Sequence, residues 1–448
     1  MKLIGFHKIG FHKESPRLFL ESGRLGPLGF TPGTPVFLSH SANRVTMTLR
    51  PPRQQMGAYT VSHRRAAGGL RPMLDICSSS ALAPLADYAE AKVVVVNGNI
   101  TVMPSIRAFH IRKALSAKPP FRVLELFSGG GTLSKAFEQN ECFKIEAGME
   151  LETRFADVWQ KTNPEATLIQ ADIRMVSPIE LPPFEILVAG IPCTDHSTQG
   201  RAAKSLAGQP ETGNTGDLFI HVLSIVAAKM PIACLFENVP NFGESLAGKT
   251  LKNNLRQLGY HIEEQILEPN QEWNEPSNRR RWVCICTLRP GFALRSPTTP
   301  FEGTSSLFLD KPDPEQDRFD ASRIAGTIAG RRLHDQRHRD KGHGFGFTVL
   351  DGSEKKIPTI GRVYYKINDG PFVATEFGPR MLRQQEIERI QGSRLPVSHY
   401  ATAVEIYGQG VQTRLFSQIV DQLAEFLTTR PNQLPEKRAI GQLCLFAA

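Results

Sequence analysis

Apolar and polar residues alternate in short runs along the first hundred positions, and Gly, Pro and Asn separate the runs. Alternation with a period of two residues is typical of half-buried β-strands. A weak internal repeat is superimposed on this pattern with an offset of 55 to 57 residues. Its matched stretches are Pro16, Leu18 and Leu20 with Pro72, Leu74 and Ile76; 25–28 with 82–85; 36–38 with 93–95; and Val45 and Met47 with Ile100 and Val102. Each unit is predicted to form a strand, a Leu-rich turn and two further strands, and two such units can bury a face that neither buries alone.

The pattern changes after a basic stretch at 107–120, which we predict to be a short helix and a linker that ends in a Pro-Pro pair. Beyond it, continuous apolar runs alternate with stretches of helical period. The predicted strands are 123–127, 144–150, 185–190 and 233–237, and the predicted helices begin near Thr132, pass through Phe155 and Trp159, and follow Asp217. This alternation predicts an α/β fold with a doubly wound, open parallel sheet whose ligands bind at the carboxyl ends of the strands.

Residues 288–375 break this regularity, because Gly, Pro and charged residues dominate there and no period persists. Helical order returns at 379–392 and again at 411–427. The irregular stretch is therefore expected to be organised differently from the segments on either side of it.

Composition narrows the class of protein. At 448 residues, 40% of them hydrophobic, the chain is long enough for two or three domains whose cores need no disulfide bonds. Its seven cysteines are odd in number and scattered, which argues against a disulfide framework or a paired Cys-x-x-Cys metal site and favours a reducing compartment. No apolar run approaches the roughly 20 residues that span a bilayer, and the start lacks the apolar core of a signal peptide. We therefore expect a soluble, cytoplasmic protein.

The formal net charge of +9 is distributed unevenly. Residues 1–119 contain 16 Lys and Arg against 5 Asp and Glu, a net charge of +11, which leaves 37 against 39, or −2, for the remainder of the chain. A basic segment joined to a near-neutral body predicts that one part of the protein meets a polyanion. A solvated basic face would give the same composition, and composition alone does not separate the two.

Glycines and acidic residues follow the predicted strands of the α/β segment. The sequence LELFSGGG at 124–131 runs from a strand into a turn whose backbone a ligand can approach closely. Glu150 ends the next strand about 20 residues later, where an acid commonly binds a ribose diol, and Asp172 follows near another strand end. Because there is no phosphate-binding Lys and no Walker pattern, an adenosyl ligand fits better than a nucleoside triphosphate.

Three further motifs carry reactive or charged side chains. Cys193 follows a buried strand in a Gly/Pro loop, where it is either a reactive thiolate or, like most lone cysteines, a small buried hydrophobe. Glu237 ends a very apolar strand; burial there raises the pKa of a carboxyl group, and a protonated Glu237 can donate to a ring nitrogen. Arg279 and Arg281 share one face of a strand and point together.

The order of these motifs resembles that of the DNA cytosine-5 methyltransferases of bacterial and phage type. The resemblance spans roughly residues 121–430 and rests on FSGGG, Met149-Glu150, Ala171-Asp172-Ile173, Pro192-Cys193, Glu237-Asn238-Val239, Arg279-x-Arg281 and YGQGV at 407–411. It implies a DNA (cytosine-5-)-methyltransferase with the doubly wound fold of S-adenosylmethionine-dependent methyltransferases and with double-stranded DNA as its partner. It also implies a role in DNA methylation within restriction-modification, and a target cytosine that is flipped out of the duplex.

The resemblance implies roles for individual residues. Cys193 would add to C6 of cytosine, and Glu237 would protonate or hydrogen-bond N3. Asn238 would hold the Cys193 loop, while Arg279 and Arg281 would fix the cytosine O2 and Glu237. The residues that match the S-adenosyl-L-methionine pocket are Phe127, Ser128, Gly129, Gly131, Glu150, Asp172, Ile173, Pro192, Leu218 and Gln409. No metal is required.

Some positions depart from the family pattern without removing Cys193 or Glu237. Thr194-Asp195-His196 stand where Gln and an aromatic residue are usual, Ser277 replaces Gln before the arginines, and Gln409 replaces Asn. In the recognition segment, the basic stretch 330–345 is predicted to be a solvated loop that contacts DNA phosphates and guanine. Its candidate DNA-binding residues are Arg331, Arg332, Arg337, Arg339 and Lys341, and Arg380, Leu382 and Glu386 match the helix that supports this domain in the family.

Two shorter resemblances concern the ends of the chain. Residues 16–38 resemble the swapped-hairpin fold of AbrB/SymE-type DNA-binding proteins, with the second half supplied by the same chain. The alternative is a β-rich addition that only shields the main domain. The tail sequence Gln442–Phe446 (QLCLF) resembles a bacterial sliding-clamp-binding pentapeptide, which docks its apolar residues in a preformed groove. Packing of these residues on their own domain is the alternative.

Together these predictions divide the chain into a basic β-rich module at 1–119, a catalytic domain at 120–287 and 376–430, a target-recognition domain at 288–375, and a tail at 431–448. An RNA (tRNA) cytosine-5 methyltransferase is one alternative, and the long basic insert argues against it, because reading duplex DNA needs many groove and phosphate contacts. A DNA-binding regulator with a vestigial methyltransferase domain is another, against which both Cys193 and Glu237 argue. A DNA-modifying enzyme is expected on the nucleoid. The sequence does not predict the target site or the oligomeric state.

Overall fold

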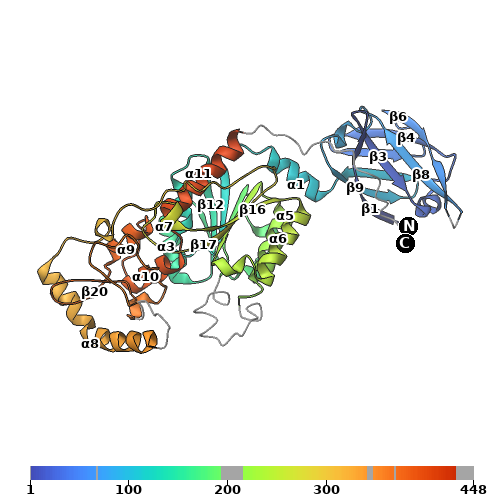
Figure 1. Ribbon diagram of the computed structural model, residues 1–448. Coiled ribbons are helices and arrows are strands. Elements are labelled where there is room, and N and C mark those ends of the chain that lie inside the picture. Colours follow the sequence, from blue (N-terminus) through green and yellow to red (C-terminus); the bar gives the residue numbers. More distant parts are fainter. Residues whose placement is uncertain (1, 67–68, 193–214, 341–346, 368–369, 430–448) are drawn as a thin grey trace. The chain divides into compact units, whose positions relative to one another are not determined.

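The computed structural model describes residues 2–66, 69–192, 215–340, 347–367 and 370–429, with the backbone alone at 338–339. The described chain divides into two compact units, which comprise residues 2–116 and 117–429. Figure 1 shows the helices and strands, and each unit has its own hydrophobic core. Among the described residues, no helix is both long enough and apolar enough to cross a membrane.

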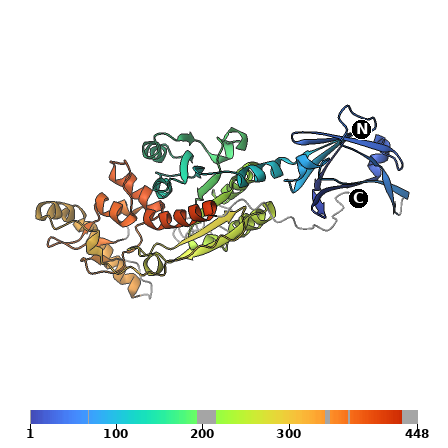
Figure 2. The same ribbon diagram turned by 90° about the horizontal axis from the view of Figure 1, so that it is seen from above.

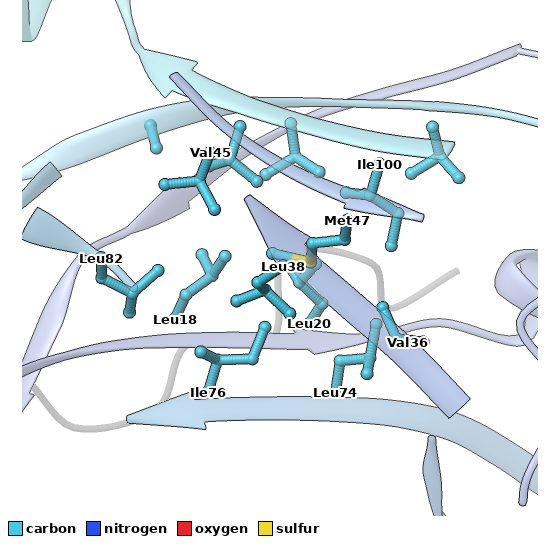
Figure 3. Packing of buried hydrophobic residues seen from close by; sticks show 14 of the residues in the cluster. Leu18, Leu20, Val36, Leu38, Val45, Met47, Leu74, Ile76, Leu82 and Ile100 are labelled. Atoms are coloured by element: carbon cyan, nitrogen blue, oxygen red, sulfur yellow. The ribbon is translucent and has the colours of Figure 1, made fainter. Parts of the chain in front are cut away.

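The described part of the first unit forms two antiparallel sheets. One sheet has the strand order β1-β9-β10-β5-β4-β6 and the other the order β2-β3-β8-β7. The strands are β1 (Lys2–Lys8), β2 (Gly10–His12), β3 (Ser15–Glu21), β4 (Pro35–Ser41), β5 (Arg44–Thr48), β6 (Gly57–Thr60), β7 (Ser62–Ala66), β8 (Gly69–Cys77), β9 (Glu90–Val96) and β10 (Asn99–Pro104). Because alternate residues of a strand point to one face, both sheets contribute apolar side chains to a common core, such as Leu18, Leu38 and Ile76 in Figure 3.

The two repeated segments interleave within this unit. Each contains a strand, a 3-10 helix and two further strands, and the 3-10 helices are η1 (Gly23–Leu28) and η2 (Ala83–Leu85). β3 pairs with β8, and the register places Leu18 opposite Ile76 and Leu20 opposite Leu74. Because the repeat matches Leu18 with Leu74 and Leu20 with Ile76, the two strands are related by a pseudo-twofold axis. β5 and β10 pair in the same way. β1 of the first half pairs with β9, and β6 of the second half pairs with β4, so each half extends the sheet of the other.

Helix α1 (Ile106–Leu115) ends the first unit and agrees with the helix predicted at the start of the linker. Its N-terminus is capped by Ser105, whose hydroxyl oxygen accepts a hydrogen bond from the backbone N–H of Ala108 at 3.1 Å. Arg107 and Arg112 form ion pairs with Glu90 and Asp87, which joins the helix to the strands before it.

The second unit is built on a sheet of order β13-β12-β11-β14-β15-β17-β16. Its strands are β11 (Phe121–Leu126), β12 (Phe143–Glu150), β13 (Thr167–Gln170), β14 (Ile186–Gly190), β15 (Ala233–Asn238), β16 (His261–Leu267) and β17 (Arg281–Thr287). The pairs from β13 to β15 are parallel, as predicted, whereas β17 runs antiparallel to both β15 and β16. β14 and β15 read as continuous apolar runs because both of their faces are buried.

Helices of the second unit either connect these strands or, in the case of the last three, follow them in the chain. They are α2 (Thr132–Glu138), α3 (Thr153–Thr162), α5 (Leu218–Lys229), α6 (Leu246–Leu258), α7 (Pro269–Glu272), α9 (Gln384–Gln391), α10 (Tyr400–Gln409) and α11 (Thr413–Thr429). Figure 2 shows α11 (red) alongside the sheet, where it packs on α2. The strand order reverses between β11 and β14, and the crevice at such a switch point is where open α/β sheets bind ligands.

The stretch predicted to lack regular structure contains the longest helix among the described residues, α8 (Pro314–Arg339). The prediction of a basic loop beginning at residue 330 was therefore wrong as far as Arg339, since the helix continues through Gly326 and Gly330. Among the described side chains of α8, the buried ones are Asp317, Ala321, Ile324, Ile328 and Asp335. Because two of these five are acids and two glycines lie between them, the apolar period was too weak to be recognised. The helix packs beside a small sheet of β18 (Val349–Leu350), β19 (Phe372–Val373) and β20 (Arg380–Met381).

Candidate active site and cofactor pocket

The glycine-rich turn after β11 has a backbone that few other sequences could adopt. Gly129 and Gly131 have φ values of 54° and 92°, and Phe127 takes φ 56° although it carries a side chain. A Cβ on Gly130 would lie 2.6 Å from the Ile406 side chain of α10, so this glycine is required for close packing. The hydroxyl group of Ser128 is buried without a hydrogen-bond partner among the described residues. The turn therefore presents backbone and one free polar group toward the switch point.

Glu150 lies beside this turn, as its position at the end of β12 predicts. One carboxylate oxygen accepts a hydrogen bond from the backbone N–H of Gly129 at 2.8 Å. The other accepts hydrogen bonds from the N–H groups of Leu151 and Glu152 at 2.9 and 2.8 Å. Since the side chain is only partly buried, its carboxylate remains reachable by a ligand in the crevice.

An arginine that the sequence analysis did not single out links the segment of Asp172 and Ile173 to the start of the helix that carries Leu218. Arg174 forms ion pairs with Asp172 at 3.2 Å and with Asp217 at 2.6 Å, and Asp217 immediately precedes α5. Ile173 and Leu218 are buried next to this bridge. The only sequence signal for the bridge was a basic residue two positions after the strand-end acid.

Two more of the predicted cofactor residues lie at the edges of this region. Gln409 ends α10, and its side-chain amide donates to the backbone oxygen of Glu405 at 3.1 Å. The next residues reach the glycine turn, since the N–H of Val411 donates to the Thr132 hydroxyl at 3.2 Å. Pro192 is half-buried and directly precedes Cys193, which lies outside the described residues.

Glu237 is the buried acid of the site, with 8% of the residue exposed. Burial raises the pKa of its carboxyl group, while the positive charges of Arg281 and Arg279 pull this pKa down, and the net direction is upward. Arg281 Nε lies 2.5 Å from a carboxylate oxygen of Glu237. Gly190 is the partner of Glu237 in the β14–β15 register, so the acid lies next to the chain that leads to Cys193.

Asn238 connects the same two strands. Its side-chain amide donates to the backbone oxygen of Ile191 at 3.1 Å, and its side-chain oxygen accepts from the N–H of Val239 at 2.8 Å. The residue is 1% exposed. Asn238 therefore fixes the backbone two residues before Cys193.

The prediction that Arg279 and Arg281 share one face of a strand and point together was wrong, because β17 begins only at Arg281 and the Arg279 side chain bonds other segments. Its two terminal nitrogens donate to the backbone oxygens of Ile360 and Gly408, at 3.0 and 2.7 Å. Its charge still acts on Glu237, but Arg281 alone forms the ion pair that the structure records with this acid. Arg279 thus joins the start of the strand that carries Arg281 to the recognition region, through Ile360, and to the end of α10, through Gly408.

The candidate DNA-binding residues lie on or after α8. Arg332 and Arg337 are exposed and Arg331 is partly buried, and the Arg332 guanidinium lies over the Phe347 ring at 5.6 Å. Lys341, the side chain of Arg339 and the tail Gln442–Phe446 lie outside the described residues. Among the residues that are described, no group of His, Cys, Asp and Glu side chains is arranged to hold a metal ion.

A buried acid next to the glycine turn was missed by sequence reasoning. Glu125 of β11 accepts hydrogen bonds from the Ser134 hydroxyl and, at 2.8 Å, from Trp159 Nε1. Burial raises its pKa to about 7. The available signal was a carboxylate inside the apolar strand LEL, which predicts a paired buried acid.

Comparison with known proteins adds to this geometry. The model of the C-5 cytosine-specific DNA methylase family matches residues 121–423. Type II methyltransferase M1.ScrFI of Lactococcus lactis subsp. cremoris is 26% identical over 346 residues, which cover 72% of this chain and 82% of that protein. Type II methyltransferase M.NlaX of Neisseria lactamica is 26% identical over 319 residues, 69% of this chain and 97% of that one. In fold, S. pombe Dnmt2 methyltransferase is similar with a TM-score of 0.55 and 18% identity, over 69% of this chain and 99% of that chain.

Proposed function

The chain belongs to the family of C-5 cytosine-specific DNA methylases and transfers the methyl group of S-adenosylmethionine to carbon 5 of cytosine in double-stranded DNA, and we propose that Cys193 and Glu237 carry this reaction. The observation that supports the proposal best is the position of the buried Glu237. Arg281 forms an ion pair with it, and its partner in the neighbouring strand is Gly190, three residues before Cys193. An acid and a nucleophile at one sheet edge can act on two adjacent atoms of one ring.

In the proposed reaction, the Cys193 thiolate adds to C6 of a cytosine that has been flipped out of the duplex. Glu237, whose pKa is raised by burial, donates its proton to N3, so that the attack gives a neutral enamine rather than an anion. C5 of this enamine then takes the methyl group of S-adenosylmethionine, which leaves as S-adenosylhomocysteine. Transfer of the C5 proton to water, return of the N3 proton to Glu237 and β-elimination of the Cys193 thiolate give 5-methylcytosine and free enzyme.

The pocket residues fit S-adenosylmethionine, whose sulfonium supplies an electrophilic methyl group. We assign its binding to Phe127, Ser128, Gly129, Gly131, Glu150, Asp172, Ile173, Pro192, Leu218 and Gln409. The Ser128 hydroxyl, which has no hydrogen-bond partner among the described residues, and the partly exposed Glu150 carboxylate support this assignment, since both are polar groups beside the glycine-rich turn. Asn238 orients the Cys193 backbone, and Arg281 orients Glu237.

Covalent trapping tests the nucleophile. Duplex DNA with 5-fluorocytosine at the target site should form an adduct with the wild-type protein that survives denaturation, because fluorine cannot leave C5 as a proton does. Cys193→Ala should form no adduct and transfer no label from S-adenosylmethionine. The thiol variant Cys142→Ala serves as control and should behave as wild type. Methyl transfer by Cys193→Ala would exclude the assignment.

We further propose that residues 288–375 read the target sequence, between the catalytic segments 120–287 and 376–430. The exposed Arg332 and Arg337 of α8, together with Arg331, Arg339 and Lys341, are the proposed phosphate and guanine contacts. Comparing sites methylated by wild type and by Arg337→Ala, through bisulfite sequencing of host DNA, tests this role. Loss of discrimination at one base pair supports direct reading, whereas an identical site preference and rate contradict it.

We propose that the tail Gln442–Phe446 docks on a DNA sliding clamp, as its pentapeptide pattern predicts. Such a contact would hold the enzyme on the nucleoid and would direct methylation to newly replicated DNA. A pull-down with purified clamp should lose its signal when Leu445 and Phe446 are both replaced by Ala. Retention of the same signal by the double variant would exclude this docking mode.

A further inference from the structure

The hairpin of β7 and β8 in the first unit is basic and exposed on both faces. Four consecutive residues of β7, Ser62 to Arg65, are exposed, as are Leu70 and Arg71 on β8. β7 is the edge strand of its sheet. The buried residues of β8 begin only at Pro72, so the part of the hairpin before it extends past the core.

The arginines of this hairpin lie close together. Arg64 and Arg71 are direct partners in the β7–β8 register, and Arg65 is the partner of Leu70 on the opposite face. Like charges placed directly across a strand pair destabilise a sheet. Only Arg64 has an acidic neighbour among the described residues, Glu21 at 3.6 Å, and its side chain remains 63% exposed. A polyanion would relieve this repulsion.

The pseudo-twofold repeat supplies an internal comparison. β2 and β3 form the equivalent hairpin, in which His12 and Ser15 stand where Arg64 and Arg71 stand in the second one. β7 and β8 have five and nine residues, against three and seven in β2 and β3. Arg65 is one of the two residues by which β7 is longer than β2. The extension with Arg65 and the facing pair Arg64 and Arg71 are thus found in one of the two hairpins and not at the equivalent positions of the other, although both hairpins contribute to the same core.

Three acids of the first unit form ion pairs with arginines outside this hairpin. Asp75, which lies on β8 itself, pairs with Arg17 of β3, and Asp87 and Glu90 pair with arginines of α1, whereas Glu21 pairs with Arg64 of the hairpin. The positive charge of the hairpin therefore remains in a unit that accounts for all the excess positive charge of the chain, since the residues after 119 carry a net charge of −2.

We propose that the β7–β8 hairpin is a second DNA-binding element, which enters the major groove of duplex DNA and contacts phosphates through Arg64, Arg65 and Arg71. A two-stranded antiparallel ribbon fits the width of this groove, about 12 Å in B-DNA. Exposure of both ribbon faces suits a groove with phosphates on two sides. The element acts in addition to the methyl-transfer site, and its binding does not depend on Cys193 or on a methyl donor.

The test compares two full-length variants of equal charge change. In the first, Arg64, Arg65 and Arg71 are replaced by Gln; in the control, the exposed Lys2, Lys8 and Lys13 are replaced by Gln. Binding to an unmethylated duplex is measured without S-adenosylmethionine over a range of salt concentrations. Losing three phosphate contacts should reduce the slope of log Kd against log salt by about 2.7, whereas the control should change much less. Thermal unfolding and methylation rates at low salt should match wild type for the control.

The alternatives give different outcomes. Equal slopes for the hairpin variant and wild type would overturn the proposal. An equal loss in both variants would also overturn it, because the effect would then come from net charge and not from the hairpin. Double-stranded RNA of the same length should bind more weakly than DNA, since its major groove is too deep and narrow for a ribbon. Equal binding of both duplexes would exclude insertion into the major groove. Because methyl transfer is not measured on the variant hairpin, failure here leaves the Cys193 assignment untouched.

Discussion

The proposed reaction requires Glu237 to hold a proton that it donates to N3 while the Cys193 thiolate attacks C6 of cytosine, and burial raises the pKa of Glu237. We expect Glu237→Gln to lower the rate of methyl transfer by roughly 10²–10⁴-fold, the range of general acid catalysis. A group that acts while protonated loses activity as pH rises through its pKa, so the alkaline fall of the wild-type pH–rate profile should disappear in the variant. The exposed Glu244→Gln is the control. A Glu237→Gln variant with a wild-type profile would contradict the role.

Glu125 predicts a pH dependence of stability instead of catalysis. Burial raises its pKa from 4.5 to about 7, so the folded state keeps the proton to higher pH than the unfolded chain does. The free energy of unfolding should therefore fall by about 3 kcal/mol as pH rises from 4.5 to above 7. Glu125→Gln should remove this fall, and Glu146→Gln on the neighbouring strand should not. Urea unfolding followed by tryptophan fluorescence reports on it, since the three tryptophans, Trp159, Trp273 and Trp282, lie in the second unit.

Individual residues differed in how far the sequence predicted them. Glu150 and Asn238 lie where strand-end positions place such side chains, because the sheet brings strand ends to one edge. The contacts of Arg279 were not predictable in the same way. They depend on Ile360 and Gly408, which are 81 and 129 residues away along the chain, and no local pattern carries that information.

At the scale of elements, a buried ion cluster joins α8 to the segment before α9. Arg380 is 2% exposed and bonds Glu386 at 2.8 Å and Asp317 at 3.0 Å. Replacing Arg380 by Met should cost about 3–5 kcal/mol of stability, because the buried Glu386 loses its counter-charge and Asp317 keeps only its ion pair with Arg383. The exposed Arg394→Met, whose nearest carboxylate lies at 3.8 Å, should cost less than about 1 kcal/mol. Urea unfolding of both variants measures the difference, and equal costs would contradict a stabilising cluster.

Replacement of two glycines by alanine, one in a strand and one in a helix, should change the stability of the protein in opposite directions. A Cβ on Gly148 of β12 would lie 2.2 Å from the Trp159 ring, so Gly148→Ala should destabilise the protein by about 1–3 kcal/mol through overpacking. A Cβ on Gly326 of α8 would meet nothing within 4 Å, so Gly326→Ala should stabilise the helix by up to about 1 kcal/mol. Thermal unfolding of the two variants checks both signs. A stabilised Gly148→Ala would show that the strand and the indole can move apart.

The sequence predicted strands more completely than helices. Strands β14 and β15 are continuous apolar runs and are easily recognised, whereas α8 presents to its core a stripe that includes Asp317 and Asp335. Asp317 is acceptable in the interior because arginines from a distant segment, Arg380 and Arg383, form ion pairs with it. When charged residues on a helix are buried because distant residues pair with them, the helix lacks a clear apolar period and cannot be recognised from its own sequence.

At the scale of the molecule, each unit has its own hydrophobic core, so we expect each unit to fold independently. The core of the first unit is made only of residues between Ile9 and Val102. We therefore expect residues 1–116 to fold alone, with a cooperative thermal transition, and residues 117–448 to retain methyl transfer at low salt. DNA binding by the shortened chain should be weaker and less sensitive to salt, as the excess positive charge is lost. An unfolded 1–116 fragment would show that its core needs the second unit.

The interleaved halves of the first unit also have a consequence for how it assembles. Strands that complete each other's sheets would, if carried on two chains, have to meet by collision, and their folding would depend on protein concentration. Here β1 and β9 belong to one chain, so pairing is unimolecular and survives dilution. Because the two halves are segments of one chain, their sequences can also differ from each other. One hairpin can accumulate arginines while its counterpart keeps His12 and Ser15, which a dimer of identical chains could never do.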